Sequence, residues 1–211
     1  MAEPAHPDSQ PDQRDLDTVS AQLGRVVRGV VEVAHRCPCG SPDVVRTVPR
    51  LPDGTPFPTS YYLTCPRATG ALGTLESQGL MRDMSERLLA DEGLAAAYRR
   101  AHEHYLARRA ELGDVPEIAG TSAGGMPDRV KCLHVLVAHA LAAGPGVNPL
   151  GDEALAALDD WWAAGPCVPG GRGRDLVSDL TTIAERCAAL PVLDDRPDAE
   201  ILGYDETGVP G

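Results

Sequence analysis

The fold class is decided by residues 26–65, where β-branched runs alternate with turn residues. They read VVRGVVEVA (26–34), CPCGSP (37–42), DVVRTV (43–48) and SYYLTC (60–65). β-Branched and aromatic residues favour strands, and the Pro and Gly residues between them mark turns. Three short strands joined by turns predict an antiparallel meander.

Beyond this stretch the apolar residues recur at helical spacing. A Gly-rich loop at 113–127 leads to an apolar helix expected over 128–143, and Asp152 is placed to cap a further helix that runs to Trp162. Strands followed by helices predict an α+β fold, with a small antiparallel three-stranded sheet packed against a bundle of about four to six helices. One long helical face comprises Leu94, Tyr98, Ala101, Tyr105 and Leu112.

Composition divides the chain into three parts. Residues 1–14 are rich in Pro, Gln and acidic side chains, which predicts a disordered acidic tail. A single α+β domain is expected over 15–163. Residues 164–211 are expected to form a mostly irregular acidic extension with one helix at 176–190. The formal net charge is −12, but residues 18–151 alone carry 13 acidic and 14 basic side chains.

This charge distribution argues against several classes of partner. A near-neutral core between acidic flanks lacks the basic footprint of a nucleic-acid-binding protein. The first residues show neither the basic nor the apolar region of a signal peptide, and Pro, Gly and His interrupt the weakly charged stretch 133–151. Six cysteines in such a chain are expected as reduced thiols or ligands. We therefore expect a cytoplasmic protein with no nucleic-acid or membrane partner.

The cysteines suggest a zinc site. Cys37 and Cys39 lie in the first turn of the meander and Cys65 closes its third strand, so the topology brings the three to one edge. Zinc takes four Cys or His ligands, and Cys132 is the candidate for the fourth. If Cys132 belongs to the helix, it points nearly opposite to His134, so the helix supplies one ligand only. Reduced, partly buried cysteines without metal are the alternative.

The only lysine of the chain lies in the segment GGMPDRVKCLH (124–134). Two cations in the first turn of the helix expected over 128–143 are disfavoured by the helix dipole, which suggests that a negative group occupies this end. Free amides after a flexible loop offer a ready site for a small anion or phosphate. The predicted anion site comprises Gly124, Gly125, Arg129 and Lys131, with Arg46 and Arg50 from the sheet.

Internal pairing is the alternative, with Asp128, Glu76 or Asp152 neutralising the bases. His134 lies among apolar residues, where a histidine is usually a hydrogen-bonded core residue. The functional alternative makes His134 a general acid or base and Cys132 a nucleophile. No complete catalytic motif accompanies them, so the sequence identifies no reaction.

Two strings carry a family resemblance, DGTPFPTSYYLT (53–64) and GGMPDRVKCLH (124–134), and NPLGDE (148–153) is similar as well. Across roughly Leu16 to Trp162 the chain resembles the bacterial family called domain of unknown function 501. The resemblance implies a cytoplasmic protein of actinobacteria-like genomes, encoded near a septum-formation initiator and an exopolyphosphatase. It implies no activity. A non-catalytic protein-interaction module, linked to cell division or polyphosphate metabolism, is therefore the alternative to anion binding.

Overall fold

The computed structural model describes residues 10–163, 167–168, 181, 184–189 and 196. The chain divides into two units, residues 1–169 and residues 170–211. Most of the expected N-terminal tail, residues 1–9, lies outside the described residues. So does more than half of the helix expected over 176–190, of which residues 181 and 184–189 are described, and 181 and 184–188 are helical.

An antiparallel sheet with strand order β1-β2-β3 forms the centre of the first unit. Its strands are β1 (Val30–Arg36), β2 (Pro42–Thr47) and β3 (Tyr61–Leu63). Val44 pairs with Leu63 and Val45 with Tyr62. The predicted meander and the α+β fold class are confirmed.

The two faces of the sheet have different neighbours, because alternate residues of a strand point to opposite sides. Val44, Tyr61 and Leu63 face the main hydrophobic core, which Leu133 and Leu136 join from the helical side. Val45 and Tyr62 therefore point to the other face. Helix α1 (Gln13–Leu23) packs against β2 and is held by a bidentate ion pair between Asp15 and Arg36, with both N–O distances 2.7 Å.

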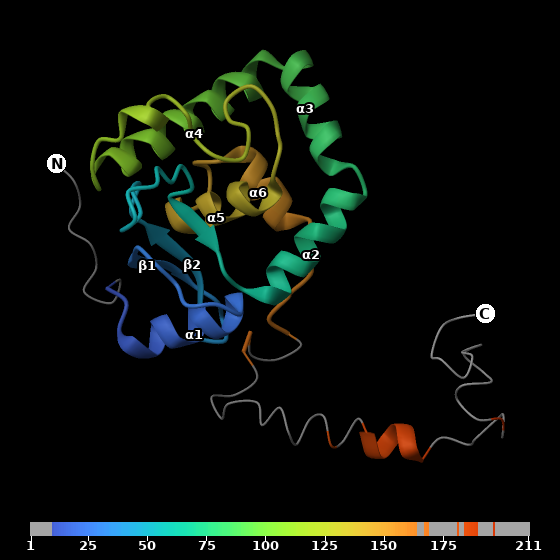
Figure 1. Cartoon of the computed structure of the whole chain (residues 1–211). Coiled ribbons are helices and arrows are strands. Elements are labelled where there is room, and N and C mark those ends of the chain that lie inside the picture. The colour runs from blue at the N-terminus through green and yellow to red at the C-terminus, as the bar shows by residue number, and fades with distance from the viewer. Residues whose placement is uncertain (1–9, 164–166, 169–180, 182–183, 190–195, 197–211) are drawn as a thin grey trace, which may run out of the picture. The chain divides into compact units, whose positions relative to one another are not determined.

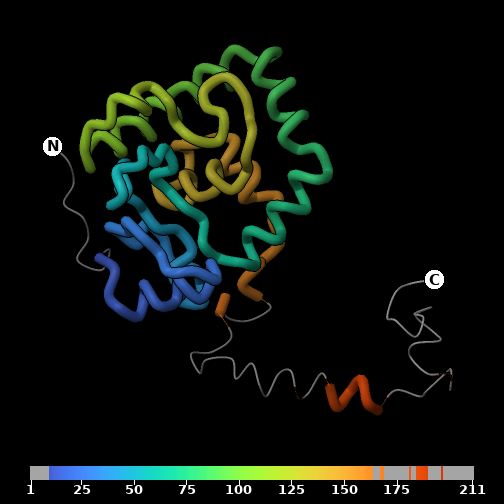
Figure 2. The backbone as a smooth tube through the Cα atoms, viewed as in Figure 1, coloured from blue at the N-terminus to red at the C-terminus, as the bar shows by residue number. Residues whose placement is uncertain are grey.

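Five helices cover the core. Figure 1 shows α2, α3 and α4 as an arc around α5 and α6, and the tube in Figure 2 follows the same arc without a break. None of the helices in the described part of the chain is long and apolar enough to cross a bilayer. The bounds are α2 (Pro66–Ser77), α3 (Leu80–Ala90), α4 (Glu92–Ala110), α5 (Leu133–Ala143) and α6 (Pro149–Ala156), with a 3-10 turn at Pro116–Ile118.

The helix expected from Asp128 begins at Leu133 instead. The preceding residues close a tight turn, in which the amide of Lys131 donates to the carbonyl of Gly124 at 2.8 Å. Gly125 has a φ of +93°, and a Cβ there would lie 2.7 Å from the carbonyl oxygen of Arg129. These hydrogen bonds and the left-handed glycines bend the chain where the sequence pattern alone suggested helix.

Helix α6 also begins and ends earlier than expected. Asn148 is its N-cap, and the Asn148 Oδ1 atom accepts the amide of Gly151 at 3.1 Å. Asp152, predicted as the cap, lies inside the helix and accepts the amide of Gly146 at 2.8 Å. The helix ends at Ala156, so the expected continuation to Trp162 is wrong.

Candidate functional sites

Four cysteine sulfurs gather at one place in the first unit. The Sγ atom of Cys167 lies 3.0 Å from that of Cys65, 3.4 Å from that of Cys37 and 3.5 Å from that of Cys39. The sulfurs of Cys37, Cys39 and Cys167 all lie within 4.8 Å of one another. All four are free thiols, and three of them are buried. We call this set the four-cysteine cluster.

The meander supplies three of these sulfurs. Cys37 follows β1 directly, and the amide of Gly40 donates to the Cys37 carbonyl at 2.7 Å, which closes the turn that carries Cys39. Gly40 has a φ of +86°, a conformation that favours glycine. Cys65 is the N-cap of α2, two positions after the end of β3 at Leu63. Strand pairing thus brings both ends of the meander together, as the sequence predicted.

The fourth sulfur comes from a distant part of the chain. Cys167 follows α6 and is only 3% exposed. It falls in a stretch that the composition had assigned to an irregular extension, so sequence reasoning missed it. Cys132, suggested as the fourth ligand, stands instead at the start of α5 beside Glu76 and His134.

The thiols of the four-cysteine cluster differ in acidity. Burial raises the pKa of Cys37 and Cys167, and the neighbouring sulfurs raise that of Cys167 further. Burial also opposes ionisation of Cys39, but hydrogen bonds from the backbone of Cys167 and Ser41 outweigh it and lower the pKa of Cys39 to about 6. The cluster therefore holds one thiolate readily. Ionising Cys37 and Cys167 as well requires a cation, because burial and the neighbouring sulfur oppose their negative charge.

Zinc fits this donor set. A tetrahedral zinc with Zn–S bonds of about 2.3 Å has its sulfurs about 3.8 Å apart. The three distances from the Cys167 sulfur, 3.0 to 3.5 Å, need a small outward movement to reach that spacing. The Cys65 sulfur lies outside the group whose sulfurs are all within 4.8 Å of one another, so it must also move closer to Cys37 or Cys39 to complete the tetrahedron. Four thiolates are the ligand set of closed, structural zinc sites.

A second cluster lies at the start of α5. The Cys132 sulfur is 3.7 Å from Nδ1 of His134, which is also 3.1 Å from Oε1 of Glu76. Nε2 of His134 lies 3.1 Å from the carbonyl oxygen of Thr69. The expectation that Cys132 and His134 point apart is wrong, because Cys132 is the N-cap and has extended backbone angles of −158° and 113°.

Glu76 supplies the negative group that the N-terminus of α5 attracts. Its Oε1 atom accepts the amide of Leu133 at 2.7 Å. A carboxylate at this position is favoured by the helix dipole and satisfies one of the first-turn amides. Arg129 and Lys131 are exposed beside it. Glu76 was one of the carboxylates expected to neutralise Arg129 and Lys131 by internal pairing. It does lie at this helix end, but it pairs with His134 rather than with the two bases.

Arg46 and Arg50 are engaged elsewhere. One terminal nitrogen of Arg46 lies 2.8 Å from Glu111 and the other 3.2 Å from Glu32, while Arg50 lies 2.6 Å from Glu117. Both arginines thus pair with carboxylates that are not part of the predicted anion site. Binding of an anion by Gly124, Gly125, Arg129 and Lys131 stays a prediction.

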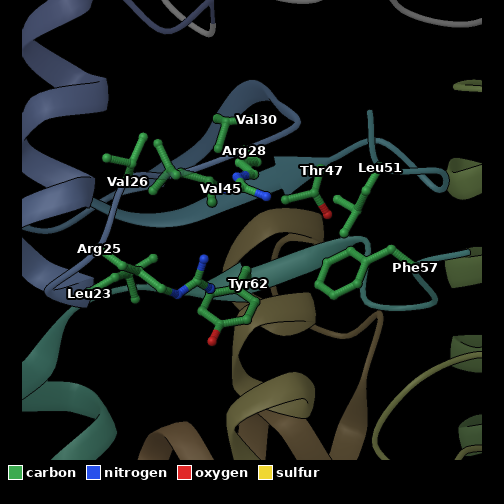
Figure 3. A pocket seen from close by; sticks show the side chains of 11 residues that line it. Leu23, Arg25, Val26, Arg28, Val30, Val45, Thr47, Leu51, Phe57 and Tyr62 are labelled. Atoms are coloured by element: carbon green, nitrogen blue, oxygen red, sulfur yellow. The ribbon is translucent and has the colours of Figure 1, made fainter. Parts of the chain in front are cut away.

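Two cavities adjoin the sheet. The first, of about 500 Å³, lies over the face that Val45 and Tyr62 share, where Figure 3 shows Val26, Phe57 and two arginines, Arg25 and Arg28, around it. The second, of about 480 Å³, is lined by Cys132 and His134 together with side chains of β3 and α2. Leu23 and Tyr62 line both cavities.

His139 belongs to a buried polar chain. The Asn148 amide nitrogen lies 3.3 Å from His139 Nδ1 and donates to it, so His139 Nε2 carries the hydrogen and faces Nδ1 of His104 at 2.9 Å. Burial lowers the pKa of His139 to about 3, with a further contribution from His104. Among the described residues these contacts give His139 a structural role in packing α5 against α6 and α4.

Comparison with known proteins agrees with the resemblance read from the sequence. A family model described as "Protein of unknown function (DUF501)" matches residues 33–156. The chain belongs to this family. Its matched region includes Cys37, Cys39, Cys65 and Cys132, whereas Cys167 lies beyond it.

Similar curated proteins cover only short parts of the chain. A 39-residue stretch, 18% of the chain, is 56% identical to "Putative antitoxin VapB34" of Mycobacterium tuberculosis, and it covers 56% of that protein. A 25-residue stretch, 12% of the chain, is 72% identical to "Antitoxin VapB" of Mycolicibacterium smegmatis and covers 30% of it. The chain thus spans about half, or less, of the length of these relatives. No solved structure matches the chain.

Proposed function

We propose that this chain is a zinc-binding protein whose metal is held by the four-cysteine cluster. The observation that carries the proposal is the convergence of three sulfurs on that of Cys167, at 3.0 to 3.5 Å. Without a cation, thiols this close resist ionisation together, because each thiolate disfavours the next. A divalent cation reverses this effect, since zinc ligands bind as thiolates.

The metal has a structural role. Four protein thiolates leave no coordination position for water or substrate, which a catalytic zinc needs. The zinc joins the β1–β2 turn, the N-terminus of α2 and the segment at Cys167, which are separated by up to 130 positions in sequence. It stabilises the native fold, because the unfolded chain has no preformed site.

A structural zinc centre supports a protein that acts through its other surfaces, either on a small anion or on a protein partner. The antitoxin relatives do not add to this proposal, because their matches reach only 39 and 25 residues. The zinc proposal can be tested independently of both possibilities.

Metal content of the full chain, purified in reductant without chelator, provides the test. We expect one zinc per chain in the wild type and loss of that zinc in Cys167→Ser. Cys187→Ser and Cys132→Ser should retain it, because Cys187 is exposed and Cys132 belongs to the second cluster. A zinc-free wild type, or equal zinc loss in Cys187→Ser, would contradict the proposal.

A further inference from the structure

The second cluster has the geometry of an activated thiol. A carbonyl oxygen only accepts hydrogen bonds, so Nε2 of His134 must carry a hydrogen to bond the Thr69 carbonyl at 3.1 Å. In neutral His134 the bare nitrogen is therefore Nδ1, which lies 3.7 Å from the Cys132 sulfur. Nδ1 also lies 3.1 Å from Oε1 of Glu76, which only accepts hydrogen bonds, so the observed contacts fit the ring after Nδ1 has taken the proton of the thiol.

Charges around the pair favour its ionised form. Burial raises the pKa of Cys132, but hydrogen bonds from His134 and from the Val135 amide outweigh burial, so the net shift is downward. The hydrogen bond to Cys132 raises the pKa of His134 to about 9 against the effect of burial, and the nearby Glu76 carboxylate raises it further. The position of Cys132 at a helix N-terminus adds the dipole of α5.

The thiol opens onto a cavity with an apolar lining. Cys132 and His134 share the cavity of about 480 Å³ with Leu63, Val135 and Pro66. Apart from these two, the residues that line it are aliphatic, aromatic, hydroxyl-bearing or amide-bearing, so the cavity suits an uncharged chain. It shares Leu23 and Tyr62 with the first cavity, whose lining beside Tyr62 appears in Figure 3.

We propose that Cys132 and His134 form a nucleophilic pair that accepts acyl groups from activated esters or thioesters, with the apolar acyl chain in this cavity. The thiolate sulfur of Cys132 attacks the carbonyl carbon, and an S–C bond forms. The bond from that carbon to the leaving oxygen or sulfur breaks, and the leaving group takes the proton held at Nδ1 of His134. Water then attacks the acyl carbon and gives a proton to Nδ1, and the S–C bond breaks to release the carboxylic acid.

Glu76 is a positioning residue in this scheme. Its Oε1 atom, 3.1 Å from Nδ1, holds the imidazole ring between the carboxylate and the sulfur while it also accepts the Leu133 amide. Glu76 is the carboxylate that faces the pair from α2, and it stabilises the charged ring after proton transfer.

Acylation of the full-length, zinc-loaded protein by p-nitrophenyl acetate and p-nitrophenyl octanoate tests the proposal. Intact-mass and peptide-mapping spectrometry should place one acyl group on Cys132, and the octanoyl ester should react faster than the acetyl ester. Cys132→Ser should lose the adduct, whereas Cys187→Ser should keep it. His134→Gln should slow acylation by about 100-fold or more, the contribution of a positioned base.

A measurement on the wild type avoids dependence on variants that fail to fold. The rate of alkylation by iodoacetamide, followed separately for Cys132 and the exposed Cys187, should show Cys132 reacting at lower pH. Equal rates and equal pH profiles for the two cysteines would overturn the proposal. So would acylation spread evenly over both, or a second equivalent of zinc bound by Glu76, Cys132 and His134, since a metal there would occupy the nucleophile.

Discussion

Gly151 offers a sharp test of how α5 and α6 pack. A Cβ atom at this position would lie 2.3 Å from the carbonyl oxygen of Leu136 and 2.9 Å from the Cβ atom of Ala140. Both neighbours belong to a rigid helix, so relief requires a shift of α5 or α6. Overpacking of this kind lowers the free energy of unfolding by about 3 kcal/mol. The higher helix propensity of alanine raises it by about 1 kcal/mol. We therefore expect Gly151→Ala to destabilise the protein by about 2 kcal/mol.

Gly73→Ala is the matched control. Gly73 also lies in a helix, α2, but it is exposed and no atom would approach its added Cβ within 4 Å. This variant should gain up to about 1 kcal/mol from helix propensity. In thermal unfolding measured in zinc-containing buffer, the Tm of Gly151→Ala should be about 4–8 °C below that of the wild type. The Tm of Gly73→Ala should be unchanged or raised. If both variants melt above the wild type, the described approach of α5 to α6 is wrong.

Two further predictions concern ionisation and anions. His139 has a pKa of about 3 in the native state against an ordinary value of 6.5, so its contribution to stability is complete above pH 6.5 and is lost as the pH falls toward 3. The loss is at most about 1.4 kcal/mol per pH unit. Urea unfolding between pH 7 and 4.5 should show a shallower decline in His139→Gln than in the wild type, and parallel curves would contradict this. If Gly124, Gly125, Arg129 and Lys131 bind an anion, phosphate should raise the Tm of the wild type more than chloride does at equal ionic strength, and this excess should disappear in Lys131→Ala. Equal effects of the two salts would contradict the predicted anion site.

The sequence predicted the parts of the molecule that depend on local patterns. The β-branched runs around Val44 and Tyr61 specified the strands, and the meander brings Cys37, Cys39 and Cys65 each within 3.5 Å of the Cys167 sulfur. The start of α6 could also have been found, because Asn148 precedes Pro149, and proline is favoured at the first position of a helix.

Other features depend on contacts between distant residues, which periodicity does not reveal. Helix α5 begins at Leu133, whose amide donates to Glu76 of α2, 57 positions earlier in the chain. Helical spacing does not reveal this contact, so the sequence placed the start of α5 too early. Cys167 reaches the other thiols across 102 to 130 positions from a segment with no apolar period of its own. The sequence did indicate that a further ligand exists, because the three cysteines of the meander leave one of the four positions of tetrahedral zinc unfilled.

X-ray absorption at the zinc edge tests the four-cysteine cluster most directly, because it reports the type, number and distance of the atoms bound to the metal. Measured on the full chain as purified, the spectrum should fit four sulfur atoms at about 2.3 Å with no lighter ligand. The same spectrum from Cys132→Ser should be unchanged. A nitrogen or oxygen ligand at about 2.0–2.1 Å in the wild type, or a sulfur lost in Cys132→Ser, would contradict the assignment of the metal to Cys37, Cys39, Cys65 and Cys167.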